Sequence, residues 1–320
     1  MFKPLLSATY TEKFPPRYPV LASPKLDGIR IIIVDGVPMT RSLKKPVPSK
    51  VVRAALECLP WFDREILAGE PNSEAACANT QSKVMSVDGM TLEDEWTFHI
   101  FDMADPYLKS MPFEERFRGM TKSVTAVTEK YFRLKPHLKV LDHTEVNNDK
   151  ELWAYEDECV KLGYEGIMIR DPFGVYKHGR STPKDRILTK IKRWEDAEGI
   201  ITETHEEMHN GNEPKINALG RVERSSHQEN KTGTGRLGGY TVKTKRHLHD
   251  DLFSLEGEDP ECPWVEFYLG ATANVKQADR VKMWEEREKF LEGKVTFKYQ
   301  PTKGAERPRF PVYKVVRFDV

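Results

Sequence analysis

The sequence predicts an α+β protein of two domains: an N-terminal domain with antiparallel sheets, and a C-terminal β-barrel of the OB-fold type. Three observations lead to this prediction. The chain has 320 residues, which is longer than one average domain of ~150 residues. Its first half alternates helices irregularly with strands and hairpin turns, a pattern that favours α+β over a doubly wound sheet. After Trp194 the sequence becomes polar and glycine-rich, and then short strands follow with a single helix.

Strand and helix signals can be placed along the first half. Strands are predicted at residues 20–22, 29–34, 61–67, 97–103, 166–170 and 187–191. Helices are predicted at residues 50–59, 112–130 and 149–162. Ser49 and Asn148 are the expected N-caps, and Gly163 is the expected residue after the last helix. The Asp35-Gly36 pair predicts a hairpin turn.

The second half predicts a small barrel. Strands are expected from residue 200 onward and at residues 238–243, 264–269, 293–299 and 312–318, with one amphipathic helix at residues 276–291. About five strands and one helix in ~120 residues suit an OB-fold. We therefore predict domains at residues 1–197 and 198–320.

Charge and cysteine content narrow the classes of function. Lys and Arg together number 50, as do Asp and Glu, so net charge indicates no partner. Basic residues are nevertheless concentrated at residues 177–193, 215–246 and 294–317, as expected where a protein meets a phosphate backbone. The sequence has no apolar span of ~20 residues and no paired cysteine motif. We therefore expect no membrane association and a reducing cytoplasm.

Lys25 is the first candidate for chemistry. The run Lys25-Leu26-Asp27-Gly28-Ile29-Arg30 reads K-x-D-G-x-R between two predicted strands. A lysine there is an amine on a rigid support, and it is a nucleophile only once it has lost its proton. A hairpin turn with a solvated lysine is the alternative interpretation of this run.

Further charged and aromatic residues lie at the ends of other predicted strands. These candidates are Glu65, Phe101, Glu165, Lys190 and Lys192. An amine nucleophile, carboxylates for Mg²⁺, a stacking aromatic ring and two cations are the groups that nucleotidyl transfer needs. The set therefore predicts an enzyme that forms a covalent nucleotide adduct.

These motifs resemble those of the covalent nucleotidyltransferases, and within them the small ATP-dependent DNA ligases of bacteriophages. Lys25–Arg30 resembles motif I, residues 62–65 motif III, residues 98–102 motif IIIa, residues 165–170 motif IV and residues 190–192 motif V. Arg317-Phe318-Asp319-Val320 resembles motif VI, although Val320 stands where Lys is usual. Arg64 also replaces a usual glycine in motif III. The resemblance implies an ATP-grasp-like adenylation domain followed by an OB-fold domain that binds DNA.

The resemblance also implies a role for each matching residue. Lys25 would carry AMP, with Lys190 and Lys192 on the α-phosphate and Arg317 as a further catalytic residue. The nucleotide would also contact Ser23, Leu26, Arg30, Arg41, Glu65 and Phe101. Arg30 and Arg41 would face the AMP and the 5′-phosphate of the nick. Glu65 and Glu165 would hold Mg²⁺ or Mn²⁺.

The predicted function is therefore ATP-dependent sealing of 3′-OH/5′-phosphate nicks in duplex DNA by a monomeric enzyme, in DNA replication, repair and recombination. Three alternatives remain open at this point. The first two are an RNA ligase and a GTP-dependent mRNA-capping guanylyltransferase of the same superfamily. The third is a non-catalytic OB module that binds nucleic acid, although binding alone would not need Lys25, Glu165 and Lys192.

Overall fold

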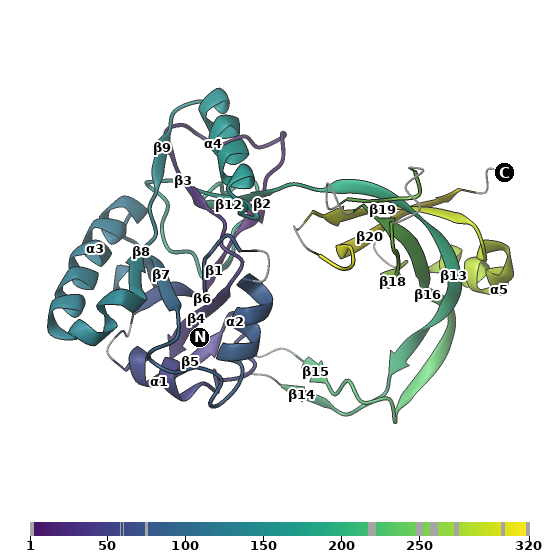
Figure 1. The fold of residues 1–320 in the computed structure, drawn as a ribbon, viewed down its shortest axis with the longest axis horizontal. Helices are drawn as coiled ribbons and strands as arrows, with labels where there is room; N and C mark the ends of the chain where they lie inside the picture. The colour runs from purple at the N-terminus through teal and green to yellow at the C-terminus, as the bar shows by residue number, and fades with distance from the viewer. Residues whose placement is uncertain are drawn as a thin grey trace. The chain divides into compact units, whose positions relative to one another are not determined.

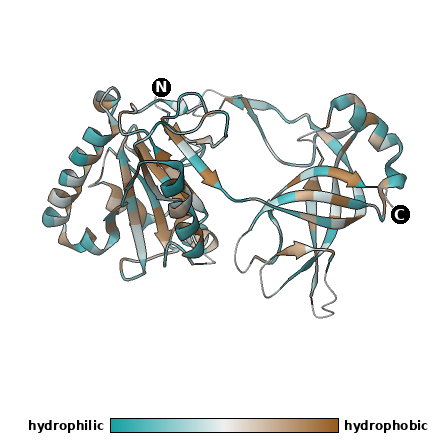
Figure 2. Cartoon of the chain, turned by 90° about the horizontal axis from the view of Figure 1, so that it is seen from above, coloured by the Kyte–Doolittle hydropathy of each residue, from teal (hydrophilic) through white to brown (hydrophobic). Residues whose placement is uncertain are grey.

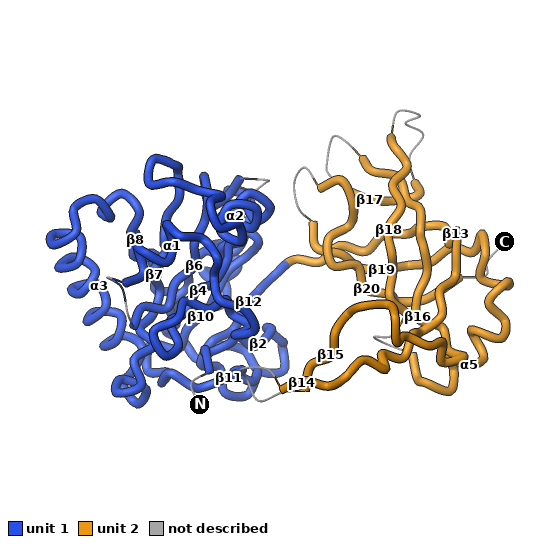
Figure 3. Tube along the Cα trace, turned by 90° about the horizontal axis from the view of Figure 1, so that it is seen from below, with its two compact units in different colours: residues 1–192 blue, residues 193–320 orange. Residues whose placement is uncertain are grey.

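The protein divides into two compact units, residues 1–192 and 193–320 (Figures 1 and 3). The computed structural model describes residues 3–57, 59, 61–73, 76–216, 222–247, 252–256, 262–271, 275–301 and 305–317. The division lies five residues before the predicted boundary at 197. Strand β13 (Glu195–Asn210) explains the difference, because Glu195 already pairs with Tyr299 of the second unit.

One five-stranded sheet of the first unit carries motifs I, III and IIIa. In spatial order its strands are β5 (Val37–Thr40), β4 (Ile29–Val34), β6 (Phe62–Ala68), β7 (Trp96–Met103) and β8 (Leu138–Val140). Its helical segments are α1 (Lys50–Leu56), α2 (Ala76–Val84), η1 (Pro106–Leu108), α3 (Phe113–Lys130) and η2 (Phe132–His137). Helix α3 packs on β7 and β8 through a buried face with helical spacing that includes Phe113, Arg116 and Met120. Figure 2 shows apolar residues concentrated on the strands of this unit.

A second five-stranded sheet of the same unit carries motifs IV and V. In spatial order its strands are β2 (Ala8–Thr9), β12 (Leu188–Lys192), β10 (Gly166–Arg170), β3 (Val20–Pro24) and β9 (Thr144–Val146). Helix α4 (Asp149–Lys161) packs against it, with Leu152 in the same apolar cluster as Ala22 and Ile169. A short parallel pair, β1 (Leu5–Leu6) and β11 (Gly179–Arg180), completes the unit.

The second unit is built on long antiparallel strands. The sheet runs β17 (Phe253–Ser254), β16 (Lys231–Arg246), β13, β19 (Lys294–Gln300) and β20 (Arg309–Arg317), and β18 (Trp264–Gly270) also pairs with β16. Strands β14 (Pro214–Ile216) and β15 (Val222–Arg224) pair separately, and α5 (Gln277–Glu285) and η3 (Arg287–Phe290) are the helical segments. Among the strands that the structure describes, no pairing closes the sheet into the predicted barrel. The unit is therefore OB-like in its strand content, without a closed ladder.

Local signals in the sequence placed most of these elements. Ser49 accepts a bond from the Val52 amide, Asn148 accepts one from Glu151, and Gly163 follows α4 with φ +94°. The Asp35-Gly36 turn has positive φ at both residues, as a type I′ hairpin requires.

Some predictions of local structure were wrong. Helix α1 ends at Leu56 rather than at 59, and the predicted helix at 276–291 divides into α5 and η3. The sheets are not purely antiparallel, because β1–β11, β2–β12 and β7–β8 pair in parallel. Helix α2 carried too few apolar residues to be recognised, since only Ala76, Thr80 and Val84 are buried.

Protonation of the buried His99 on β7 should destabilise the folded protein in acid. Burial lowers the pKa of His99 to about 4, and the charge of Lys139 adds to this effect. Unfolded chains protonate histidine below about pH 6.5, so they bind more protons than the folded state between pH 6.5 and 4. Stability should therefore fall by up to roughly 3 kcal/mol as pH drops through this window. Urea unfolding of wild type and His99→Gln across this range tests it.

His227→Gln is the matched control for this titration, because His227 is exposed. It should leave the acid dependence unchanged. If His99→Gln shows the same loss of stability as the wild type between pH 6.5 and 4, His99 is not its source.

Candidate active site

Three neighbouring strands bring the nucleophile candidate close to motifs IV and V. Lys25 follows β3, and its amide donates to the Gly166 carbonyl of β10 at 2.8 Å. Gly166 in turn pairs with Lys192 of β12. A Cβ on Gly166 would lie 2.2 Å from the Ile191 carbonyl oxygen, and its φ is +139°, so this crossing requires glycine. The strand order therefore gathers residues that are far apart in the sequence.

Lys25 and Lys192 share the carboxylate of Glu165. Nζ of Lys25 lies 2.5 Å from Oε2 of Glu165, and Nζ of Lys192 contacts Oε1. The three side chains are 20%, 14% and 9% exposed, respectively. This ion pair engages Nζ of Lys25, whereas an amine acts as a nucleophile only in its neutral form. If Lys25 is the nucleophile, as the sequence predicts, Glu165 has to release it before the amine can react.

Lys190 adds a second cation beside Lys25. Burial lowers the pKa of Lys190, and the charge of Lys25 lowers it further. Arg180 and Arg41 act in the same direction. A bound anion would relieve this repulsion, because a nearby negative charge favours the protonated form of a lysine.

Glu65 is fixed against the motif I turn. Its Oε1 accepts a bond of 3.0 Å from the Gly28 amide. A Cβ on Gly28 would lie 2.3 Å from the Ile66 carbonyl oxygen, so this close approach also requires glycine. Burial raises the pKa of Glu65, and Lys25 and the Gly28 amide oppose that shift. The carboxylate of Glu65 is thus held beside the nucleophile.

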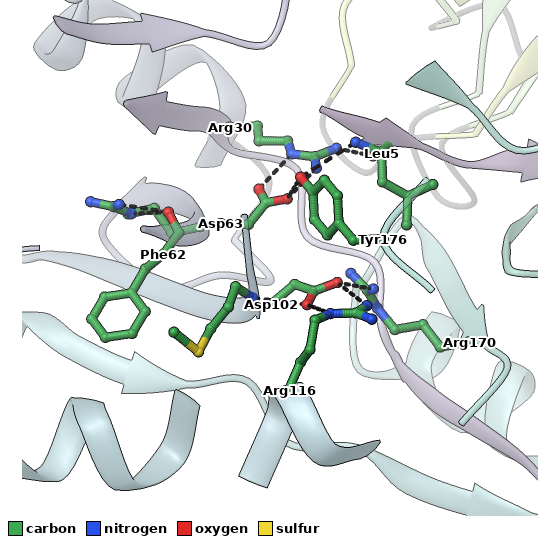
Figure 4. A network of polar contacts seen from close by, with 10 residues as sticks. Leu5, Arg30, Phe62, Asp63, Asp102, Arg116, Arg170 and Tyr176 are labelled. Carbon is green, nitrogen blue, oxygen red and sulfur yellow. Dashed lines mark hydrogen bonds and ion pairs between the residues drawn. The ribbon is translucent and has the colours of Figure 1, made fainter. Parts of the chain in front are cut away.

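Arg30 is held in a different way from that expected. Its guanidinium forms a two-point ion pair with Asp63 and donates to the Leu5 carbonyl at 2.7 Å (Figure 4). Burial disfavours its charge, but Asp63 outweighs burial and the net pKa is raised. The structure places this guanidinium on Asp63 and 5.5 Å from the ring centroid of Phe101. Arg30 thus lies between Asp63 and the Phe101 ring, and its contact with the AMP and the 5′-phosphate stays a prediction.

A buried polar network adjoins the Arg30–Asp63 pair, and the sequence motifs indicated no role for it. Tyr176 donates to Asp63 at 2.7 Å, while Asp102 pairs with Arg116 and Arg170 at 2.9 and 2.6 Å (Figure 4). The Arg170 guanidinium lies 5.7 Å from the centroid of Phe101. Two aspartates thus hold two arginines against one ring. Arg116 could have been found from its position on the apolar face of a predicted helix.

Replacing Asp102 should destabilise the protein strongly. Asp102 is fully buried, and Arg116 and Arg170 are only 1% and 6% exposed in their side chains. Asp102→Asn would leave two buried guanidinium groups without their counter-charge, which costs about 3–5 kcal/mol. Urea unfolding at neutral pH measures this loss.

The exposed pair Lys50–Asp88, at 2.8 Å, supplies the control for Asp102→Asn. Asp88→Asn should change stability by no more than about 1 kcal/mol, because solvent screens exposed pairs. Equal effects from the two substitutions would mean that burial of the Asp102 network does not determine its energy.

Two predicted contact residues, Ser23 and Leu26, have buried side chains, as does Arg64 of motif III. Ser23 lies on β3 opposite Met168, and Leu26 packs in an apolar cluster with Leu67. Leu26 can therefore meet a nucleotide only through its backbone. Arg64 donates to the carbonyls of Leu59 and Phe62, and burial lowers its pKa to about 9. Its side chain takes no place in the site, which explains how arginine is tolerated where glycine is usual.

Arg41 and Arg317 are exposed in their separate units. Arg41 follows β5 in the first unit. Arg317 ends β20 in the second unit, where Nη1 lies 3.1 Å from Oε1 of Glu198. Phe318, Asp319 and Val320, the rest of motif VI, lie outside the described residues.

The carboxylates suit a shared metal better than a resident one. Within the described ranges, no group of three or more His, Cys, Asp or Glu side chains could hold a metal ion. Mg²⁺ commonly uses one or two carboxylates together with substrate phosphates. Glu65 and Glu165 fit that requirement, because both lie next to the cations that would meet the phosphates.

Across the described helices, none is long and apolar enough to cross a membrane.

The chain is similar to solved structures of DNA ligases over its whole length. The Chlorella virus DNA ligase-adenylate is 29% identical, with 99% of this chain and 100% of that chain covered and a TM-score of 0.51. A Lig E DNA ligase is 21% identical, with the same coverage and a TM-score of 0.65, which supports the fold alone. No protein-family model and no curated protein matches the chain at a significant level.

The residues that carry the sequence motifs are mostly assembled in the first unit. Motifs I, III, IIIa, IV and V lie on β3, β4, β6, β7, β10 and β12 or next to them. Together with the full-length similarity to a viral DNA ligase-adenylate, this assembly supports the interpretation of the chain as a small ATP-dependent DNA ligase.

Proposed function

We propose that the enzyme seals nicks between a 3′-OH and a 5′-phosphate in duplex DNA through a Lys25–AMP intermediate. The single observation that carries this proposal is the cluster of Lys25, Glu165 and Lys192, with Lys190 beside it. An ion pair that only stabilised the fold would need one lysine beside Glu165. A nucleotide needs one amine that reacts and further cations that hold its phosphate.

The reaction would proceed in three steps. Nζ of Lys25 loses its proton and attacks the α-phosphorus of ATP, so that an N–P bond forms and pyrophosphate leaves. An oxygen of the DNA 5′-phosphate then attacks the same phosphorus and releases Lys25. Finally the 3′-OH attacks the DNA phosphorus, the phosphodiester forms, and AMP leaves with the electrons of the broken P–O bond.

The neighbouring side chains would each support one part of these steps. Lys190 and Lys192 would hold the α-phosphate, which draws Lys192 from Glu165 and frees the carboxylate. Phe101 would stack on the adenine, and Glu65 would accept a bond from the ribose. Glu165 and Glu65 would hold Mg²⁺ or Mn²⁺, which neutralises charge on the phosphate oxygens when bound.

The second unit would bind the DNA as an OB-fold domain. Its long strands and basic segments support this assignment, since a phosphate backbone is met by lysine and arginine side chains. We further propose a monomer that acts in the cytoplasm during replication, repair and recombination.

Mass spectrometry of the purified protein tests the first step directly. Incubation with ATP and Mg²⁺ should add the mass of AMP, whereas GTP should add nothing. The adduct should then disappear when a nicked DNA duplex is supplied, and nicked RNA should be sealed poorly. Labelling by GTP instead of ATP would contradict the proposal, as would discharge of the adduct by nicked RNA alone.

A further inference from the structure

The outer face of β16 and β18 carries an exposed tryptophan flanked by lysines. Trp264 of β18 is 50% exposed. Nζ of Lys243 and Nζ of Lys245, on the paired strand β16, lie 5.7 and 5.8 Å from its ring centroid. The alternation of the strands explains the arrangement, because Phe267 and Leu269 point into the core while Trp264 and Tyr268 point outward.

A pocket of about 580 Å³ opens at this tryptophan. Its lining residues, all from the second unit, are Lys243, Arg246, Pro263, Trp264, Val265, Glu266, Glu306 and Arg307. Pockets of ~300–1,000 Å³ hold ligands the size of a nucleotide. The hollow thus combines an aromatic wall with basic and acidic groups, which a purely structural tryptophan would not require.

We propose that this pocket binds an unpaired nucleotide of single-stranded DNA, with the base stacked on Trp264 and the phosphates near Lys243 and Lys245. This goes beyond nick sealing, because it needs neither ATP nor Lys25. An enzyme with such a pocket would hold a displaced or protruding strand apart from the duplex that it joins.

Stacking, rather than phosphate attraction, is the larger contribution expected here. Lys243, Arg246 and Arg307 line the pocket together with Glu266 and Glu306, so the net charge of the lining is small. Base stacking on an aromatic ring contributes about 1–3 kcal/mol per base, which corresponds to roughly 5- to 150-fold in affinity. The distinguishing measurement is therefore dependence on the base at constant phosphate charge.

The test uses the full-length protein without ATP and two labelled decamers. One is a thymidine decamer, and the other is an abasic decamer with the same phosphates, both with 5′-hydroxyl ends. Fluorescence anisotropy should show that the wild type binds the thymidine decamer at least about fivefold more tightly than the abasic decamer. Trp264→Ala should bind the two decamers equally, and Trp264→Phe should keep most of the difference.

Two further variants make the test specific to this pocket. Trp153, on α4 of the first unit, is similarly exposed at 43%, and Trp153→Ala should keep the wild-type preference. The double variant of Lys243→Ala and Lys245→Ala should keep the base preference but reduce the salt dependence of binding. The log–log slope should fall by roughly 0.7 for each DNA phosphate that the two lysines neutralise in the wild type.

Each alternative result would overturn the inference. Equal binding of the two decamers by the wild type would mean that no base is stacked. A base preference that persists in Trp264→Ala would place the stacking elsewhere, for instance at Phe101. Loss of preference in Trp153→Ala would show a general effect. None of these results depends on whether AMP is transferred, so the sealing proposal is tested separately by the AMP adduct.

Discussion

Lys25→Ala should form no AMP adduct and seal no nicks, while the protein remains folded. The side chain of Lys25 is only partly buried, and removing it leaves Glu165 paired with Lys192. Glu165 therefore keeps a counter-charge, so the fold should be preserved and the loss should be chemical. Intact-mass analysis after incubation with ATP and Mg²⁺ measures the adduct, and sealing of a labelled nicked duplex measures the complete reaction.

Lys25→Arg distinguishes charge from nucleophilicity at the same position. Guanidinium can pair with Glu165, but it does not lose its proton in a protein. The variant should therefore be as inactive as Lys25→Ala. Lys50→Ala, which removes an exposed lysine of α1, should form the adduct at the wild-type rate. An adduct that persists in Lys25→Ala would assign the nucleophile to another residue.

The sequence contained most of the information about the first unit, because its motifs coincide with strand ends. K-x-D-G-x-R placed Lys25 between two strands, and the structure has Lys25 directly after β3 and Gly28 pressed against β6. The flanking strands β3 and β4 lie in different sheets, so the alternative of a hairpin turn was wrong. Alternation along a strand has a period of two, so Lys190 and Lys192 of β12 share one face, and both lie close to Lys25 or to its partner Glu165. Local patterns of this kind can be interpreted without knowing which distant strands pair.

The buried network could not be predicted in the same way. Asp63 meets Tyr176 at a separation of 113 residues, and Asp102 meets Arg170 at a separation of 68. No local pattern indicates which distant partner will satisfy a buried carboxylate. For the same reason no sequence pattern indicated that Arg30 pairs with Asp63 in the structure. The first part of β16 was likewise not predicted as strand, because residues 231–236 are all polar or glycine and none of them is buried.

The ion pair of Arg317 is weak enough for the guanidinium to change partners. Its side chain is 54% exposed, and its contact with Glu198 at 3.1 Å is solvent-accessible. Such pairs contribute about 0–1 kcal/mol. Arg317 and Lys25 belong to different units, so Arg317 can act on ATP only if the second unit closes over the first. Its fork of donors would then fit the β,γ-phosphates, which leave as pyrophosphate.

Arg317→Ala should therefore block formation of the AMP adduct and largely spare sealing of a nick that already carries 5′-AMP. Pyrophosphate departs only in the first step, so Arg317 loses its target once AMP is on the DNA. Two assays on one preparation measure the difference between the steps: adduct formation with ATP, and sealing of a synthetic adenylylated nick without ATP.

Lys314→Ala is the matched control, because Lys314 lies on the same strand, pairs with Asp196 at 2.6 Å and is 43% exposed. It should form the adduct normally. Equal loss in both assays would make Arg317 a structural or DNA-binding residue, and equal retention would show that the motif ending at Val320 does not act on ATP.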